Sequence, residues 1–135
     1  MMNPNNLHIV IAEDDPDDGE LIFESFSKHQ SFERIDVVEN GQELLDYLNG
    51  SEQKPDLILT DINMPVLSGI EALEVICSDE SLAKIPTFVY STSINPVYEV
   101  RCMQLGTRGF IIKPFKLKEF DEIPSKILNI LAKEE

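Results

Sequence analysis

The sequence contains no tryptophan, only two cysteines and few basic residues for its length of 135. Its 11 Lys and Arg residues stand against 25 Asp and Glu residues, so the formal net charge is −14. That balance excludes the counterion release by which basic proteins bind nucleic acid or anionic lipid, and we expect direct binding to neither. Residues 1–6 lack the basic and apolar blocks of a signal peptide, and no apolar run approaches the roughly 18 residues of a membrane span. The expected location is therefore the cytoplasm.

The two cysteines, Cys77 and Cys102, both fall in helical patterns, and neither belongs to a C-x-x-C motif. We interpret them as reduced structural thiols with no disulfide or metal role. A chain of this length with 42% apolar residues buries roughly two-thirds of its unfolded surface in one core, so it needs no disulfide or structural metal for stability. No repeat and no linker tract divides it, and we expect a single domain over residues 1–135.

Five short apolar runs alternate with five amphipathic stretches, which predicts strands alternating with helices. Four of the runs are almost continuously apolar, as strands covered on both faces of a parallel sheet should be, while the second is weaker and fits a sheet edge. This alternation predicts parallel strands with right-handed crossovers, and hence an α/β fold in three layers, an α/β/α sandwich. The expected strands are Leu7–Ala12, Ile35–Glu39, Leu57–Thr60, Thr87–Ser91 and Gly109–Ile112.

The amphipathic stretches place their apolar residues on one helical face. The last of them carries Pro124 in its interior, where the missing N–H and the ring clash cost ~3 kcal/mol, so we expect a kink or a restart there. The expected helices are Asp17–Lys28, Gly41–Leu48, Ile70–Ser78, Pro96–Leu105 and Leu117–Lys133.

Unusual polar residues stand at the ends of four expected strands. Glu13 and Asp14 follow the first strand, Asp61 follows the third, Ser91 ends the fourth and Lys113 follows the fifth. Since ligands of open parallel sheets sit at the carboxyl ends of the strands, we expect these groups to meet on one rim. Carboxylates gathered there either raise a pKa or hold a hard cation such as Mg²⁺, and the cation is the simpler interpretation.

The same groups are the parts needed to move a phosphoryl group onto a carboxylate, a reaction that mainly requires charge neutralisation and in-line positioning. Asp61 is the candidate nucleophile because it stands alone at the end of the central strand. Lys113 is a point charge suited to a carboxylate or a phosphoryl oxygen, and Ser91 adds a hydroxyl donor.

Four motifs at these strand ends follow one another in a specific order. They are the pair Glu13-Asp14, the run Asp61-Ile62-Asn63-Met64-Pro65 with Ser68-Gly69 after it, Ser91, and Lys113-Pro114-Phe115. With them the chain resembles a response-regulator receiver domain of two-component signalling, in its CheY-like, stand-alone form, over residues 7–131. The resemblance implies a flavodoxin-like (βα)5 fold with strand order 2-1-3-4-5. It also leaves open a cis bond before Pro114, since only an X-Pro bond adopts that form at modest cost.

The resemblance further implies a phosphoacceptor rather than an enzyme acting on external substrates. A sensor histidine kinase or a phosphotransfer protein would pass a phosphoryl group to Asp61. Mg²⁺, or Mn²⁺ in its place, would be held by Asp14, Asp61 and the backbone carbonyl of Asn63, with Glu13 acting through water.

The family's switch couples a hydroxyl to an aromatic side chain, here Ser91 and Phe110. When Asp61 is phosphorylated, Ser91 would move to bond the phosphoryl group and Phe110 would turn inward, which changes the face built from the fourth helix, fifth strand and fifth helix. Asn63 and Ser93 occupy the positions that tune dephosphorylation. We expect no output domain, so the signal should leave by contact with a downstream protein or a kinase, or by homodimerisation across that face.

Plainer interpretations apply to several polar residues. The acid run 13–18 also fits a helix-capping segment, and we assign Asp15, Asp17 and Asp18 to that role. His8 lies in a strand pattern and His29 ends a helix, and neither has a metal-spaced partner, so both are interpreted as structural.

Two other functions fit some of the same parts. A haloacid-dehalogenase-like phosphatase needs a second Asp two residues after its nucleophile as general acid, and Asn63 stands there instead. A pseudo-receiver scaffold, which acts without phosphorylation, would be marked by a missing acid or lysine, and none is missing.

Overall fold

The computed structural model describes residues 5–92 and 95–134, which form strands and helices in alternation. The strands are β1 (Leu7–Ala12), β2 (Phe32–Val38), β3 (Leu57–Thr60), β4 (Thr87–Ser91) and β5 (Gly109–Ile112). The helices are α1 (Pro16–Lys28), α2 (Gly41–Gly50), α3 (Gly69–Ser78), α4 (Pro96–Gln104), α5 (Leu117–Phe120) and α6 (Ile123–Glu134). None of the helices in these ranges is long and apolar enough to span a membrane.

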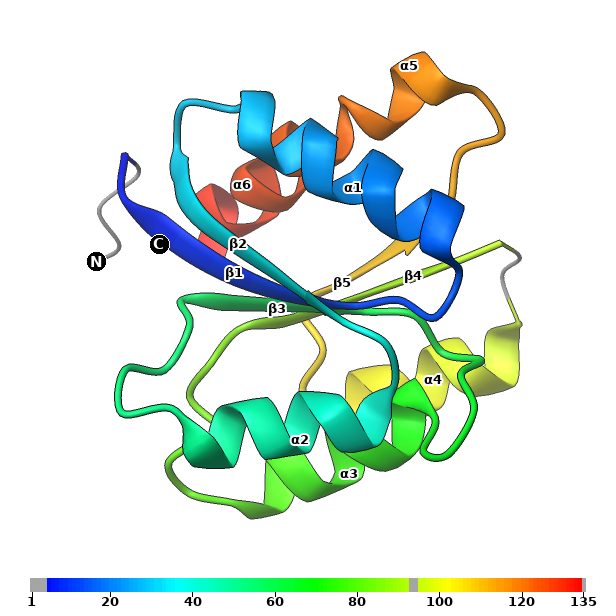
Figure 1. The fold of residues 1–135 in the computed structure, drawn as a ribbon. Helices are drawn as coiled ribbons and strands as arrows, with labels where there is room; N and C mark the ends of the chain where they lie inside the picture. The colour runs from blue at the N-terminus through cyan, green and yellow to red at the C-terminus, as the bar shows by residue number, and fades with distance from the viewer. Residues whose placement is uncertain (1–4, 93–94, 135) are drawn as a thin grey trace.

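The strands form one parallel sheet in the order β2-β1-β3-β4-β5. Figure 1 shows α1, α5 and α6 on one face of this sheet and α2, α3 and α4 on the other. The predicted three-layer α/β/α architecture and the strand order 2-1-3-4-5 are therefore confirmed.

Four strands have the bounds that the sequence predicts, whereas β2 spans Phe32–Val38 rather than the predicted Ile35–Glu39. At the edge of the sheet, β2 pairs with β1 and with no other strand among the described residues. Its early residues Glu33 and Arg34 are exposed, so no apolar run marks them. The interruption predicted at Pro124 is also confirmed. α5 ends at Phe120 and α6 restarts at Ile123, which places Pro124 in a first turn, where no N–H is required.

All residues of β1 except His8 are apolar, and their packing shows why. Ile9 and Ile11 pack into the cluster beneath α1 and α6, whereas Val10 and Ala12 pack into the cluster beneath α2 and α3. All four are 0% exposed. A central strand covered on both faces therefore holds its carboxyl end in a fixed place on the rim.

Two smaller expectations have separate outcomes. Cys102 is buried in the core, as a structural thiol should be, but Cys77 is exposed on α3, so the structural interpretation of Cys77 is wrong. Both thiols are free. The Lys113–Pro114 bond is trans, the form that X-Pro bonds favour by about 0.5–1 kcal/mol.

Candidate functional site

The carboxyl ends of β1, β3 and β5 bring three predicted residues into direct contact. Lys113, which follows β5, places its Nζ 2.6 Å from Glu13 Oε1 and 2.9 Å from Asp61 Oδ2. Asp18, from the first turn of α1, adds a carboxylate oxygen 3.0 Å from the same Nζ. The side chains of Glu13, Asp61 and Lys113 are 0%, 11% and 6% exposed, so the protein shields these ion pairs from water.

Backbone pairing fixes Asp61 beside β1. Its N–H donates to the Ala12 carbonyl at 3.0 Å, and its Oδ1 accepts from the N–H of Ile62 at 2.6 Å. Gly69 begins α3 directly behind it and donates its own N–H to the Ile62 carbonyl at 2.9 Å. A Cβ at position 69 would lie 2.0 Å from the Asp61 carbonyl oxygen, so only glycine fits there. The start of α3 therefore locks the segment that carries Asp61.

Glu13 is held by three donors. The hydroxyl of Tyr90 donates to Oε1 at 2.5 Å, Lys113 Nζ reaches the same oxygen, and the N–H of Asp15 donates to Oε2 at 3.1 Å. Tyr90 belongs to β4 and is 0% exposed, and Lys113 Nζ lies 4.9 Å from the centre of its ring, within cation–π range. Glu13 is thus drawn inward, toward the sheet.

Burial and ion pairing shift the pKa values of this cluster. Burial raises the pKa of Glu13, and the donors around it offset only part of the rise. Burial alone would lower the pKa of Lys113, but the hydrogen bonds and charges of Glu13 and Asp61 outweigh it and raise that pKa above the ordinary lysine value. Burial also raises the pKa of Tyr90 well above the usual phenol value, and the Glu13 charge adds to the rise. Lys113 therefore stays a cation and Tyr90 a donor at neutral pH.

The same rim has the donor set of a divalent-cation site. One carboxylate oxygen from each of Glu13, Asp14 and Asp61 lies within 4.8 Å of the other two. Asp14 is exposed, whereas the other two are buried, so the acidic pocket opens to solvent on the Asp14 side. Oxygen donors with an open side fit Mg²⁺, which keeps several waters, and they fit Mn²⁺ as well.

The remaining predicted residues lie around this cluster at different depths. Ser91 ends β4, the neighbour of β3, and is buried. Asn63 is exposed in the loop between β3 and α3. Phe110, in β5, is half-buried and packs against a cluster that includes Cys102 of α4. Ser93 lies outside the described residues.

Sequence reasoning missed two members of the cluster, Asp18 and Tyr90. Asp15 is the N-cap of α1, as expected, but Asp18 contacts Lys113, so its assignment to capping alone is wrong. The sequence feature that could have indicated this contact is the position of Asp18 in the first turn of α1, the helix that begins directly after the acidic rim. The signal for Tyr90 was its phenol hydroxyl within a strand expected to be covered on both faces, because a buried tyrosine hydroxyl usually needs a partner.

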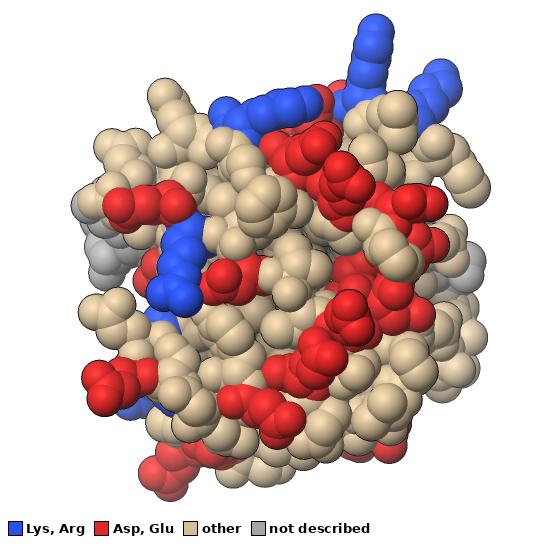
Figure 2. Space-filling view, viewed as in Figure 1, with Lys and Arg blue, Asp and Glu red and all other residues tan. Residues whose placement is uncertain are grey.

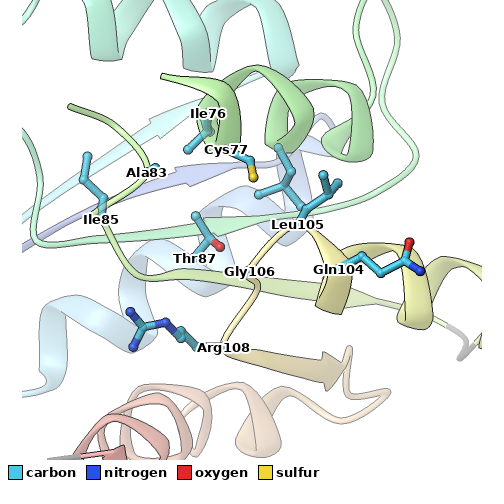
Figure 3. Close-up of a pocket in the computed structure, with 10 residues that line it drawn as sticks. Ile76, Cys77, Ala83, Ile85, Thr87, Gln104, Leu105, Gly106 and Arg108 are labelled. Carbon is cyan, nitrogen blue, oxygen red and sulfur yellow. The ribbon is translucent and has the colours of Figure 1, made fainter. Parts of the chain in front are cut away.

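Two further surface features lie away from the cluster. A cavity of about 280 Å³ is lined by Ile76, Cys77, Leu105 and Arg108 among others (Figure 3). It lies at the amino ends of β4 and β5, opposite the acidic rim, and none of the rim residues lines it. Figure 2 shows acidic side chains spread in bands over the viewed face, with few basic ones between them.

Comparison with known proteins agrees with this geometry. A protein-family model described as "Response regulator receiver domain" matches residues 9–123. The two-component response regulator ORR11 of Oryza sativa subsp. indica is 29% identical over 119 residues, which cover 88% of this chain and 80% of that protein. The phosphorylated cyanobacterial phytochrome response regulator RcpA is similar in structure, with a TM-score of 0.84 at 32% identity over 90% of this chain and 91% of the other. The Mn²⁺-bound form of response regulator Rcp1 shares the fold, with a TM-score of 0.80 at 24% identity over 90% and 91%.

Proposed function

Because the chain belongs to the response regulator receiver family, we propose that it accepts a phosphoryl group on Asp61. Such a domain is typically a phosphoacceptor signalling module rather than an enzyme, and membership of a two-component system implies a histidine kinase partner. The donor would be the phosphohistidine of a sensor kinase or of a phosphotransfer protein. Since RcpA is a phytochrome response regulator, a phytochrome-type kinase is the first donor that we would test.

The observation that carries this proposal is the buried contact of Lys113 Nζ with Asp61 Oδ2, at 2.9 Å, inside the acidic pocket of Glu13, Asp14 and Asp61. In the proposed step an Oδ atom of ionised Asp61 attacks phosphorus. The P–N bond to the donor histidine breaks, and its electron pair returns to the imidazole ring. Such a transfer needs positioning and charge neutralisation more than covalent chemistry from its surroundings.

The neighbouring groups have distinct proposed roles. Lys113 neutralises negative charge on the transferred group, and the hydroxyl of Ser91 donates to one of its oxygens. Asp14, Asp61 and the carbonyl of Asn63 would hold Mg²⁺ or Mn²⁺, with Glu13 acting through water, and the cation would supply further charge neutralisation. The Mn²⁺-bound form of Rcp1 supports a divalent cation of this kind.

The proposed output is a change on the face formed by α4, β5 and the last helices. Phosphorylation would draw Ser91 toward Asp61 and let Phe110 turn inward, away from its present contacts on the α4 side. Large apolar side chains are already exposed on this face, which favours protein contact, either with a downstream target or with a second copy. They are Val97, Val100 and Met103 on α4 and Ile112 on β5. That the domain works without an attached output domain stays a prediction, as do the modulator roles of Asn63 and Ser93.

Incubation with acetyl phosphate and Mg²⁺, followed by intact mass measurement, tests the acceptor. The wild type should gain the mass of one phosphoryl group, and Asp61→Asn should gain none, because an acyl phosphate requires a carboxylate nucleophile. Asp46→Asn is the matched control, since Asp46 is an exposed acid on α2, and it should behave like the wild type.

Two results would contradict the proposal. Equal labelling of wild type and Asp61→Asn would place the acceptor elsewhere. Turnover of external phosphomonoesters would favour a phosphatase.

Chelation of divalent cations should abolish labelling of the wild type, and labelling that persists would remove the cation from the mechanism.

A further inference from the structure

The carboxylate of Glu13 has little capacity left for a cation. A carboxylate offers about four lone-pair sites, two on each oxygen. Oε1 accepts from the Tyr90 hydroxyl at 2.5 Å and faces Lys113 Nζ at 2.6 Å, so both of its sites are used. Oε2 accepts the N–H of Asp15 at 3.1 Å, which leaves one site on that oxygen. Glu13 therefore lies within reach of Asp14 and Asp61 but is turned toward β4.

Tyr90 is the donor that is built to keep Glu13 in this position. It is fully buried in β4 within the cluster that includes Phe88 and Ile111, so its ring has no freedom to follow a moving carboxylate. Lys113 holds Glu13 less firmly than Tyr90 does, because its ammonium is shared among Glu13, Asp18 and Asp61. If Glu13 moved away, Lys113 would still contact two carboxylates.

We infer that Tyr90 is a positioning residue that keeps Glu13 out of direct contact with the cation and thereby makes the site selective for Mg²⁺ over Ca²⁺. Mg²⁺ keeps several waters and binds through one or two carboxylates, which Asp14 and Asp61 supply. Ca²⁺ takes six to eight oxygen ligands, so a third direct carboxylate favours it more. The inference rests on the cation site of the proposed function, and it adds that this site prefers Mg²⁺ to Ca²⁺.

Calorimetric titration of wild type and Tyr90→Phe with MgCl₂ and with CaCl₂ tests the inference. Phenylalanine keeps the ring in the core and removes only the hydroxyl. The ratio of the Ca²⁺ dissociation constant to the Mg²⁺ dissociation constant should fall by about tenfold, as expected for loss of a hydrogen bond to a charged group. Adding Glu13→Gln to Tyr90→Phe should cancel the change, because a neutral amide is a poor ligand. Tyr98→Phe, on the exposed side of α4, is the matched control and should leave the ratio unchanged.

A second measurement needs no variant and so does not depend on how Tyr90→Phe folds. On Mg²⁺ saturation of the wild type, the carboxyl ¹³C resonance of Glu13 should shift much less than those of Asp14 and Asp61. An equal shift of all three would overturn the inference, as would an unchanged dissociation-constant ratio in folded Tyr90→Phe. Absence of any Mg²⁺ binding to the wild type would instead overturn the proposed cation site itself, so the two failures are distinguishable.

Discussion

Replacing Gly69 with alanine tests whether the start of α3 positions Asp61. Two effects of this change have opposite signs. Glycine in a helix costs about 0.5–1 kcal/mol relative to alanine, so propensity alone predicts that Gly69→Ala stabilises the protein. The new Cβ, however, would lie 2.0 Å from the Asp61 carbonyl oxygen, 3.0 Å from Asp61 C and 3.1 Å from Ile62 Cα. All three are backbone atoms, so no change of rotamer relieves the contact.

The steric clash should outweigh the gain in helix propensity. Real Cβ atoms essentially never approach another atom closer than 3.0 Å, so the end of β3 and the start of α3 must separate by about 1 Å, the difference from the 2.0 Å contact. Overpacking typically costs about 1–3 kcal/mol, and after the gain in propensity we expect a net loss of about 1–2 kcal/mol in the free energy of unfolding. The same shift moves Asp61 relative to Lys113, and a misplacement near 1 Å can slow a reaction by ~100-fold.

Urea denaturation measures the stability of this variant, and intact mass after timed incubation with acetyl phosphate measures its phosphorylation rate. Gly50→Ala is the matched control, because Gly50 ends α2 and nothing lies within 4 Å of the Cβ it would gain. It should lose no stability and be phosphorylated like the wild type. If Gly69→Ala proved at least as stable as the wild type and equally reactive, the positioning role of this glycine would be refuted.

Tyr47 and Val66 give two further predictions. Burial raises the pKa of Tyr47 to about 12, and Asp36, which accepts from its hydroxyl at 2.6 Å, adds to the rise. Because this pKa is higher in the folded state, its contribution to stability is complete below pH 10.0, the ordinary value, and is lost as the pH rises through about 12. Asp36→Asn should lower the Tyr47 midpoint in a phenolate absorbance titration referenced to Tyr47→Phe, and an unmoved midpoint would contradict the role of Asp36. Val66 has a φ of 68°, a left-handed conformation unfavourable for a β-branched residue, and its side chain is exposed. Val66→Gly should therefore stabilise by about 0.5–1 kcal/mol in urea denaturation, net of the entropy of glycine, and a loss of stability would count against strain at this turn.

Most of the fold could be predicted because buried parallel strands leave a strong mark in a sequence. β1, β3 and β4 are covered on both faces, so all of their residues except His8 are buried and most are apolar, and their bounds can be read directly. The edge strand β2 has no such requirement, since residues such as Glu33 and Arg34 face solvent, and its start was therefore missed. The break at Pro124 could be predicted because the missing N–H is a local property that no packing restores.

The candidate site could be predicted only in part. Residues directly at strand ends, such as Asp61 and Lys113, are placed by the sheet itself, so the topology brings them together whatever the side chains do. Asp18 and Tyr90 act from inside a helix and a strand, where the dominant patterns indicate a cap and a core residue. Their contacts depend on side-chain directions across 95 and 77 positions of sequence, which no local pattern contains.

The charge of the rim explains why the proposed reaction should need a cation. The rim holds the ammonium of Lys113 and four carboxylates, those of Glu13, Asp14, Asp18 and Asp61, so it carries a formal net charge of −3. An aspartyl phosphate would replace one of these negative charges with about two, which makes the rim more negative still in a partly buried setting where repulsion is strong. A divalent cation would add two positive charges. The phosphorylated rim with its cation would then be less negative than the resting rim without metal. Lys113 alone cannot supply this compensation, because its ammonium already serves three carboxylates.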